Sequence, residues 1–478
     1  MKSSTFEKIW ELSPHYYLPE SYNKLLTLTR QLIDAYNEDG RLDENPFTPT
    51  TKRKLSLPSL SVNSLLENKI CLVTGGLGCV GSALVNKLIH FNVEKIIVVD
   101  KEHPSQVVGI KDSRVIYVQC DICDAESLYA IFKAHQPEYV FHTAAQRNPG
   151  LAEKQIVDTI SRNIFGTLNV VNACEMATSV KQCVFSSTGK ASRYYTKEIY
   201  AATKKICEYI FDVYAKRSSI RYTMVRFTHI LDNSLMNMEL RDLTAKDHLP
   251  IHSPGKYVTA QNVSEAVDLL LNALIHSTVG QCKFLIVRNL EWPVESLEVA
   301  LYYIRKAGSP IPVVFRGNPP GYSEKFFRGQ MDWSSPQDLN LLINVYESNY
   351  RRLNKEGDIV ISQILPTDST VLAKAIKSLQ IASDERHAKE TLWNELRNLV
   401  QASLVHADHH DTLNILKWGL EPEYLLAENA KVEDFQPLVA LLTESLRERQ
   451  LLEQIEYLVP GGNFSSDTHS LNACALRR

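Results

Sequence analysis

A short segment near the middle of the chain has residue types and spacing that could oxidise an alcohol. Tyr200 and Lys204 are four residues apart, so in a helix their side chains share a face. We expect the Lys204 ammonium group to lower the pKa of the Tyr200 phenol, which would make Tyr200 a base near neutral pH. Thr188, or its neighbour Ser187, would then hydrogen-bond the hydroxyl that is oxidised. An ordinary amphipathic helix face is the alternative explanation of this spacing.

A glycine-rich segment upstream has the pattern that binds a dinucleotide. Gly76, Gly78 and Gly81 form G-x-G-x-x-G directly after the apolar run ICLVTG and before an apolar helical pattern. In this pattern the glycines permit a tight turn, close approach of a pyrophosphate and close packing of the helix on the sheet. Asp100 ends the next apolar run, near the spacing of about 20 residues at which a carboxylate holds a ribose. A carboxylate that only caps a strand is the alternative.

These features predict NAD as the cofactor, with NADP as the alternative. Asp100 favours NAD because its carboxylate can accept from both ribose hydroxyls, whereas Lys101 could pair with a 2′-phosphate. Lys204 would also hold the nicotinamide ribose. The remaining residues expected to bind the cofactor lie in the glycine segment and at the ends of later apolar runs: Gly75, Cys79, Val80, Asp121, Ile122, Ala144 and Ala145.

The apolar runs around these residues predict an α/β fold that would bring them together. Six short runs alternate with helical patterns: ICLVTG, KIIVVD, VIYVQCD, YVFHTAA, QCVFSSTG and YTMVRF. Runs that are apolar on both faces are typical of strands in a parallel sheet covered by helices on both sides. We therefore expect a doubly wound parallel sheet of the Rossmann type, with a small substrate lobe and the candidate residues near the carboxyl ends of the strands.

The periodicity along the chain predicts three unequal parts. Residues 1–62 are expected to form a helical extension followed by a linker rich in Pro, Thr and Ser. Residues 63–335 would form the dinucleotide-binding domain with its substrate lobe. Residues 336–478 have mainly helical patterns apart from the run DIVISQIL, and end in a segment typical of a loose tail. The helical extensions on both sides predict a homo-oligomer.

Composition and charge restrict the class of protein. The chain has 478 residues, of which 44% are hydrophobic and 22% charged, as expected for a globular protein with sizeable cores. A net charge of -3 does not predict nucleic-acid binding. No apolar run reaches the about 20 residues that span a membrane, and the first residues lack the apolar region of a signal peptide. Nine scattered cysteines are expected to be free thiols without a metal, which predicts a cytoplasmic protein.

Several segments resemble the extended short-chain dehydrogenases, and among them the nucleotide-sugar 4,6-dehydratases of polysaccharide biosynthesis. HTAAQRNPGLAE from His142 is similar to the family's HAAAxKHVPLxE, and NIFGTLNVVNAC from Asn163 to its NVxGTxNVxxAA. FSSTGKA from Phe185 is similar to ISTDKA, and YAATKK to GATKR. FRGNPPGYSEKF from Phe315 resembles GLRPGEKLxEEL, and GLEPEYLL from Gly419 resembles the late LVPEY signature.

The resemblance implies oxidation of a nucleotide-activated sugar at carbon 4 by NAD(P), loss of the carbon 5 proton, elimination of the 6-hydroxyl and return of the hydride to carbon 6. In the family, the Asp and Lys of a T-D-K triplet are associated with the acid and base roles. Here the triplet is Thr188-Gly189-Lys190, so Lys190 remains as a possible base and the carboxylic acid is missing. Glu198 could replace that acid in space, or could be an ordinary solvated loop carboxylate.

The residues expected to bind the substrate also depart from the family pattern. Arg147 replaces the usual Lys, and its permanent charge suits anion binding better than proton transfer. Arg226 belongs to the matching VRF segment. His229 replaces the family's Asn in a segment that lacks the usual glycine-rich pattern. The candidate phosphate partners, each of which could equally be an ordinary surface charge, are Lys256, Arg316 and Lys325.

Three functional hypotheses follow from these residues. The first is an NAD(P)-dependent enzyme that oxidises carbon 4 of a nucleotide sugar, with 4,6-dehydration of a UDP-sugar as the leading reaction. The missing acid at Gly189 keeps a 4-epimerase or a net dehydrogenase open as alternatives. A cofactor-bound scaffold without catalysis is a further alternative, against which the intact Tyr200 and Lys204 argue.

Overall fold

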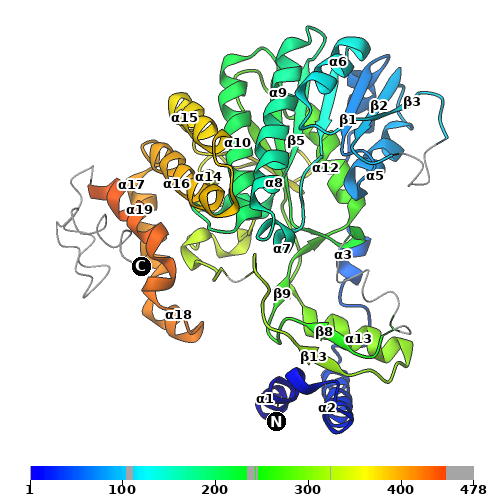
Figure 1. Cartoon of the computed structure of the whole chain (residues 1–478), viewed down its shortest axis with the longest axis vertical. Coiled ribbons are helices and arrows are strands. Elements are labelled where there is room, and N and C mark those ends of the chain that lie inside the picture. Colours follow the sequence, from blue (N-terminus) through cyan, green and yellow to red (C-terminus); the bar gives the residue numbers. More distant parts are fainter. Residues whose placement is uncertain (1, 104–110, 234–242, 244–245, 323, 448–478) are drawn as a thin grey trace.

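The centre of the computed structural model is a sheet of nine strands, which carries the predicted doubly wound arrangement (Figure 1). The model describes residues 2–103, 111–233, 243, 246–322 and 324–447. The strand order is β14-β15-β11-β6-β5-β4-β1-β2-β3. Neighbouring strands from β3 to β11 pair in parallel, and β15 and β14 are antiparallel to their neighbours. The α/β class and the mostly parallel sheet expected from the sequence are therefore confirmed.

The strands of this sheet match the apolar runs of the sequence. Their bounds are β1 Ile70–Thr74, β2 Lys95–Asp100, β3 Val115–Gln119, β4 Tyr139–His142, β5 Gln182–Thr188, β6 Arg221–Phe227, β11 Lys283–Val287, β14 Arg352–Leu353 and β15 Ile359–Gln363. All six predicted runs form strands, and the run DIVISQIL contains β15. β11 was not predicted, although its short apolar run is buried along its whole length.

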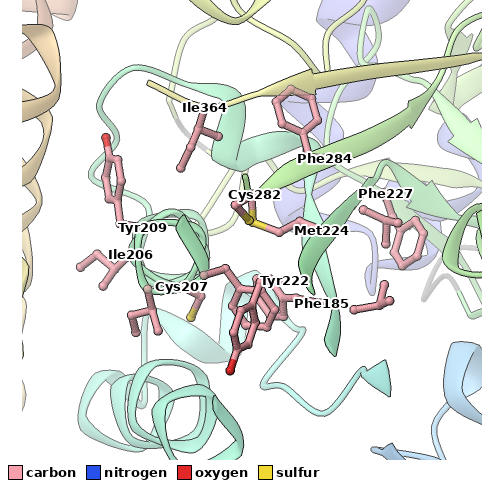
Figure 2. Packing of buried hydrophobic residues seen from close by; sticks show 14 of the residues in the cluster. Phe185, Ile206, Cys207, Tyr209, Tyr222, Met224, Phe227, Cys282, Phe284 and Ile364 are labelled. Carbon is pink, nitrogen blue, oxygen red and sulfur yellow. The ribbon is translucent and has the colours of Figure 1, made fainter. Parts of the chain in front are cut away.

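Helices cover both faces of the sheet. Their bounds are α4 Ser59–Leu66, α5 Cys79–Leu88, α6 Ala125–His135, α7 Pro149–Ala152, α8 Ile156–Ile160, α9 Gly166–Met176, α10 Ile199–Arg217 and α12 Val263–Ile275. Helix α12 packs with α4 and α5, whereas α9 packs with both α6 and α10. Figure 2 shows the core beside α10, where Phe185, Tyr222 and Phe284 are buried.

A separate lobe lies beyond the carboxyl ends of the parallel strands (Figure 1). It contains the pairs β7 His229–Ile230 with β10 Ala260–Gln261, β9 Tyr257–Val258 with β12 Val294–Glu295, and β8 Leu249–Ile251 with β13 Val313–Phe315. Helix α13, Ser296–Ala307, packs on it. The lobe has its own hydrophobic cluster, which includes Leu301 and Phe315.

The N-terminal helices α1 (Lys2–Leu12) and α2 (Pro19–Glu38) belong to this lobe. Buried Ile9 and Leu32 lie in the same hydrophobic cluster as β13 and α13. The chain then passes through α3, Thr48–Lys52, to the sheet. Because an amphipathic helix is stabilised chiefly by burial of its apolar face, the lobe is the packing partner that α1 and α2 require.

The C-terminal helices pack beside α10, at the left of Figure 1, away from α1 and α2 at the bottom. Their bounds are α14 Val345–Ser348, α15 Ser369–Gln380, α16 Glu385–Leu404, α17 His409–Gly419, α18 Pro422–Ala427 and α19 Gln436–Arg447. Helix α16 contacts α10 and α19, which joins this region to the sheet domain. The predicted loose tail lies outside the described residues. No helix in the described part of the chain is long and apolar enough to cross a membrane.

Candidate active site

A cavity of about 1480 Å³ lies between the carboxyl end of the sheet, the lobe and the C-terminal helices. Its wall includes the glycine segment at one end, lobe residues such as Lys256, and Leu438 of α19. A pocket for one small ligand is typically about 300–1,000 Å³. The cavity therefore has room for a dinucleotide and a second ligand together.

Most residues that the sequence singled out line this cavity. They are Gly75, Gly78, Cys79, Val80, Gly81, Asp100, Lys101, Asp121, Ile122, Ala144, Ala145, Arg147, Ser187, Thr188, Lys190, Tyr200, Lys204, His229, Lys256 and Lys325. Gly76, Glu198, Arg226 and Arg316 do not line it. The fold thus brings residues from five parallel strands and from the lobe to one place.

The turn between β1 and α5 fits the pyrophosphate of a dinucleotide. Gly75 has φ +69°, and a Cβ there would lie 2.6 Å from the Ala144 nitrogen. A Cβ at Gly81 would overlap the Gly75 carbonyl, so the helix begins tightly against the turn. Gly78 precedes the first helical residue and lines the cavity. The unpaired amides and the dipole of the α5 N-terminus therefore face a site suited to an anion.

Gly76 has a packing role beneath this turn. A Cβ at Gly76 would lie 2.6 Å from Cγ1 of Val98 on β2. Side chains of any size would push the glycine turn away from the sheet. Gly76 therefore allows the turn to form without itself lining the cavity.

Asp100 lies at the cavity end of β2 and supports the glycine turn. Its Oδ2 accepts a hydrogen bond from the Leu77 amide at 3.0 Å, and its Oδ1 accepts one from the Glu102 amide at 3.1 Å. Each carboxylate oxygen can accept further hydrogen bonds, so Asp100 can also hold ribose hydroxyls. Lys101 lies 3.8 Å from the Glu102 carboxylate, which also lines the cavity.

Tyr200 and Lys204 share one face of α10, but burial sets their pKa values. Burial raises the pKa of Tyr200 to about 12, although a hydrogen bond with Thr188 acts in the opposite direction. Lys204 donates to the Ser186 carbonyl at 2.9 Å, and burial lowers its pKa to about 8. The expectation that Lys204 brings the Tyr200 pKa down is therefore wrong for the protein without ligand, because the lysine contacts Ser186 and desolvation of the phenol dominates.

Ser187 and Arg226, both expected at the substrate, belong to a buried ionic cluster. Ser187 donates to Oε1 of Glu208 at 2.6 Å. The Arg226 guanidinium lies 2.7 Å from both Glu208 and Glu347, and its side chain is fully buried. This cluster joins α10, β6 and α14. The expectation that Arg226 binds substrate is therefore wrong, and Thr188 is the hydroxyl that contacts Tyr200.

Leu342 fills the space beside Gly189, where the family has a carboxylic acid. A Cβ at Gly189 would overlap Cδ2 of Leu342, which is itself buried. Leu342 belongs to the segment that precedes α14. An aspartate at position 189 would therefore require the Leu342 side chain to shift, because this leucine occupies the space that a side chain at position 189 would take.

Lys190 lies in a cavity wall beside a carboxylate. Its Nζ donates to Oε2 of Glu198 at 2.6 Å and to the Gly321 carbonyl at 3.2 Å, and lies 4.7 Å from the centre of the Tyr322 ring. Burial lowers the Lys190 pKa, against the effect of Glu198. Glu198 is only 5% exposed. The alternative of a solvated loop carboxylate is therefore wrong.

Two further charged residues of this cluster were missed in the sequence. Arg193 lies 3.2 Å from Oε2 of Glu198 and 2.7 Å from Oε2 of Glu324, so it joins the two carboxylates. Glu324 also accepts from the Thr196 hydroxyl at 2.5 Å and lines the cavity. Burial raises the Glu324 pKa. Glu324 stands in the segment FRGNPPGYSEKF, but sequence spacing alone does not place it beside Arg193.

Asn163 is another residue that the sequence did not single out. It lies in a π-helical turn, Ser161–Phe165, a type of turn that often occurs at functional sites. Its Nδ2 donates to the Thr203 hydroxyl at 3.0 Å, and its Oδ1 accepts from the Gln146 amide at 2.8 Å. Asn163 thus ties α10, which carries Tyr200, to the segment after β4. Its position at the start of the segment NIFGT, which is similar to a family pattern, is the sequence signal that could have identified it.

The cations predicted to bind the substrate have different surroundings. Arg147, Lys256 and Lys325 line the cavity, and Lys325 also pairs with Asp434 at 2.8 Å. Arg316 instead lies 2.6 Å from Nε2 of His248 and does not line the cavity.

His229 contributes an unused polar atom to the cavity. Burial lowers the His229 pKa, which favours the neutral ring. Within the described residues, its buried Nε2 has no hydrogen-bond partner. Because a buried polar atom is normally hydrogen-bonded, this nitrogen is suited to contact a ligand.

Comparison with known proteins identifies the family. Residues 71–323 match the family model described as polysaccharide biosynthesis protein. Similar curated proteins include the probable polysaccharide biosynthesis protein EpsC of Bacillus subtilis, 23% identical over 283 residues, which are 56% of this chain and 46% of EpsC. The capsular polysaccharide biosynthesis protein CapD of Staphylococcus aureus is 24% identical over 318 residues, 60% of this chain and 52% of CapD.

Two further similarities concern a single enzyme and a solved structure. A UDP-N-acetylglucosamine 4,6-dehydratase (inverting) of Campylobacter jejuni is 28% identical over 174 residues, 35% of this chain and 51% of that protein. The structure of Pen from Bacillus thuringiensis superposes with a TM-score of 0.54 and 21% identity, over 63% of this chain and 89% of Pen, and shows the shared fold.

The matches to the curated relatives cover only part of each protein. The chain spans about half the length of the curated relatives EpsC and CapD that it matches. The family model covers more than half of this chain and includes the glycine turn, Thr188, Tyr200 and Lys204. The chain therefore belongs to the polysaccharide biosynthesis protein family, a branch of the extended short-chain dehydrogenases.

Proposed function

We propose that the protein uses NAD to oxidise the carbon 4 hydroxyl of a nucleotide-activated sugar and then eliminates water across carbons 5 and 6. The observation that carries this proposal is the presence of Thr188, Tyr200 and Lys190 in one cavity with the glycine turn. The room for a second ligand and the similarity to a UDP-N-acetylglucosamine 4,6-dehydratase support a nucleotide sugar as substrate.

The residues around the glycine turn suit NAD. Gly75, Gly78 and the α5 N-terminus would hold the pyrophosphate, and Asp100 the adenosine ribose. The carboxylates of Asp100 and Glu102 both line this end of the cavity and would repel a 2′-phosphate, which favours NAD over NADP. Bound NAD would supply the reversible oxidation of the sugar carbon and a positive charge that favours the Tyr200 phenolate.

The first step depends on Tyr200 and Thr188. Tyr200 removes the proton of the carbon 4 hydroxyl, and Thr188, which contacts the phenol, orients that hydroxyl. Lys204 lies on the same helix face and supports the cofactor side of the site. Because its pKa is lowered to about 8 by burial, it is still largely charged at neutral pH.

The second step depends on Lys190. A ketone at carbon 4 acidifies the neighbouring carbon 5 proton, so a base at this position can remove it. Burial lowers the Lys190 pKa and makes its neutral form more accessible, while Glu198 holds the Nζ in place. Arg147, in the segment after β4, and His229 and Lys256, in the lobe, line the same cavity, where they would contact the nucleotide diphosphate.

Incubation of the purified protein with UDP-N-acetylglucosamine and NAD tests this function. We expect a 4-keto-6-deoxy product, detected as a mass lower by one water, with no net consumption of NAD. Accumulation of reduced cofactor without loss of water would instead indicate net oxidation. If UDP- and dTDP-hexoses all remain unchanged and no cofactor is reduced, the proposed oxidation is wrong.

A 4-epimerase is the second candidate function. Leu342 fills the space of the family's acid, so an enzyme of this fold could carry out the oxidation and its reversal without elimination. The product would then have the same mass as the substrate and inverted stereochemistry at carbon 4. Nuclear magnetic resonance of the product distinguishes this outcome from dehydration.

A further inference from the structure

We propose that Glu324 is the general acid that protonates the departing 6-hydroxyl, the role that Gly189 leaves without a residue. This proposal rests on the proposed dehydration. It assigns the acid to the loop after β13 instead of the end of β5. The juxtaposition that carries it is that Glu324 and Lys190 line the same cavity and are linked through Arg193 and Glu198.

Of the two carboxylates in this cluster, Glu324 is the one with access to substrate. Glu198 does not line the cavity, is 5% exposed, and has Oε2 engaged by both Lys190 and Arg193. Glu324 lines the cavity, and its side chain is 30% exposed. Glu198 is therefore a positioning residue for Lys190, and Glu324 is the carboxyl group that can contact a sugar.

The contacts of Glu324 show which oxygen can carry the proton. The hydrogen bonds that the described residues make to Glu324 are those of Arg193 at 2.7 Å and Thr196 at 2.5 Å, and both go to Oε2. Oε1 is therefore the atom left to hold a proton and donate it. Burial and the nearby Glu198 favour the protonated form, against Arg193, Thr196 and Lys190, and the pKa of Glu324 is raised overall.

One loop holds both the acid and the base. The Gly321 carbonyl accepts from Lys190, the Tyr322 ring lies against the same ammonium group, and Glu324 follows in the same loop. Lys325 then ties the loop to the C-terminal region through Asp434 at 2.8 Å. The loop that contacts the base thus also carries the acid, and Lys325 connects it to the C-terminal region.

The elimination balances with these two groups. The Lys190 Nζ takes the carbon 5 proton, and the electrons of that C–H bond are held as the enolate of the carbon 4 ketone. They then form the double bond between carbons 5 and 6. The bond between carbon 6 and oxygen breaks, and the oxygen takes its electron pair and the Glu324 proton to leave as water. Lys190 is then an ammonium and Glu324 a carboxylate. Return of the cofactor's hydride to carbon 6 and of a proton from Lys190 to carbon 5 would complete the 4-keto-6-deoxy sugar, and water reprotonates Glu324.

The test compares Glu324→Gln with the wild-type protein on UDP-N-acetylglucosamine in deuterated water. Glutamine keeps the shape and the Arg193 contact of the side-chain oxygen but cannot donate an acidic proton. We expect formation of the 4-keto-6-deoxy product to fall by about 100-fold or more. Exchange of the carbon 5 hydrogen for deuterium should persist, because oxidation at carbon 4 and proton removal do not need Glu324.

Two further variants make the result specific. Glu324→Asp should recover part of the dehydration, since it restores an acid. Glu433→Gln, the same chemical change at an exposed residue outside the cavity, should leave dehydration unchanged. Full dehydration by Glu324→Gln would overturn the assignment, and so would loss of carbon 5 exchange together with dehydration in a variant of normal stability.

The outcome for the wild-type protein separates this inference from the proposed function. If wild-type protein neither oxidises nor dehydrates any nucleotide sugar offered, the proposed function fails. If it oxidises or epimerises the sugar without loss of water, the oxidative part of the function stands and the role of Glu324 is overturned. Only dehydration by the wild type with selective loss in Glu324→Gln supports both.

Discussion

Tyr200 and Lys204 lie on one face of α10, as their spacing predicts, but their surroundings make the phenol harder to ionise in the free protein. Burial raises the pKa of Tyr200 to about 12. The Lys204 ammonium donates to the Ser186 carbonyl. A base near neutral pH therefore needs additional positive charge in the cavity, such as an oxidised nicotinamide supplies.

Replacement of Tyr200 by Phe tests the role of the phenol. Tyr200→Phe should lower the rate of sugar oxidation by roughly 100- to 10,000-fold, because a general base contributes about that factor. Binding of NAD, measured by calorimetry, should change little, since Phe keeps the ring. Tyr17→Phe, at a residue that is 68% exposed, is the matched control. Retention of full activity by Tyr200→Phe would contradict the assignment and favour a scaffold.

At the scale of elements, His142 joins β4 to its neighbours as a neutral ring. It lies at the end of β4, fully buried, with Nδ1 at 2.8 Å from the Thr74 hydroxyl of β1 and Nε2 at 2.9 Å from the Thr167 hydroxyl of α9. Burial, helped by the Lys204 charge, lowers the pKa of His142 to about 3. Protonation would place a charge in the core beside the cavity.

This lowered pKa predicts how stability depends on pH. Unfolding raises the His142 pKa from about 3 to about 6.5, so the unfolded chain binds the extra proton between these values. The stabilisation is complete above about pH 6.5 and is lost as pH falls towards 3. From pH 7 to pH 5 the loss due to His142 is about 2 kcal/mol. Urea unfolding should show that the free energy of unfolding falls less from pH 7 to pH 5 in His142→Gln than in the wild-type protein. Equal losses in the two proteins would contradict the prediction.

The contact between Gly189 and Leu342 predicts coupling between two elements. Gly189→Ala should destabilise the protein by about 1–3 kcal/mol through overpacking, because its new methyl group overlaps Leu342. Leu342→Ala removes that overlap at the cost of a cavity. The free energy of unfolding of the double variant should be about 1 kcal/mol higher than the sum of the two single effects predicts. Urea unfolding of the four proteins measures this coupling, and simple additivity would contradict the prediction.

For the whole molecule, the N-terminal helices matter because they cover the edge of β13. The Val313 amide donates to the Thr29 hydroxyl at 3.0 Å, and the Phe315 amide donates to the Ser13 hydroxyl at 2.9 Å. Both hydroxyls are buried. Helix α2, through Thr29, and the turn that follows α1, through Ser13, thus satisfy backbone donors of the strand that leads into the loop with Tyr322 and Glu324.

Replacement of Thr29 by Val tests this coupling. Thr29→Val keeps the shape but leaves the Val313 amide without an acceptor, which should cost about 1–3 kcal/mol of stability. Thr27→Val, on the exposed face of α2, should change stability by less than about 0.5 kcal/mol. Hydrogen exchange of the Val313 amide should accelerate in Thr29→Val alone. Equal exchange in both variants would show that α2 does not support β13.

The C-terminal helices complete the cavity from the other side. Phe435 and Leu438 line it, and Asp434 pairs with Lys325 of the loop that carries Glu324. The described parts of both helical extensions, up to residue 447, therefore have contacts within the protein itself. The homo-oligomer expected from these extensions stays a prediction, as does cytoplasmic localisation, and sedimentation as a monomer at micromolar concentration would contradict the former.

The sequence by itself determined the features that depend on local spacing. The glycine turn after β1, Asp100 at the end of β2, and Tyr200 with Lys204 on one helix face follow from periods of a few residues. The parallel sheet follows from alternating apolar runs, because buried strands and their covering helices must each be apolar. These local rules placed the cofactor side of the cavity.

Only the tertiary structure decided which groups surround Lys190 and Gly189 and which charged residues pair in the core. Leu342 beside Gly189, Arg193 between Glu198 and Glu324, and Arg226 between Glu208 and Glu347 bring together segments far apart in the chain. No spacing rule predicts such contacts, because they depend on how separate elements pack. Burial then sets the pKa values, and it too is a property of the packed molecule: the same residues in an extended chain would be solvated and chemically ordinary.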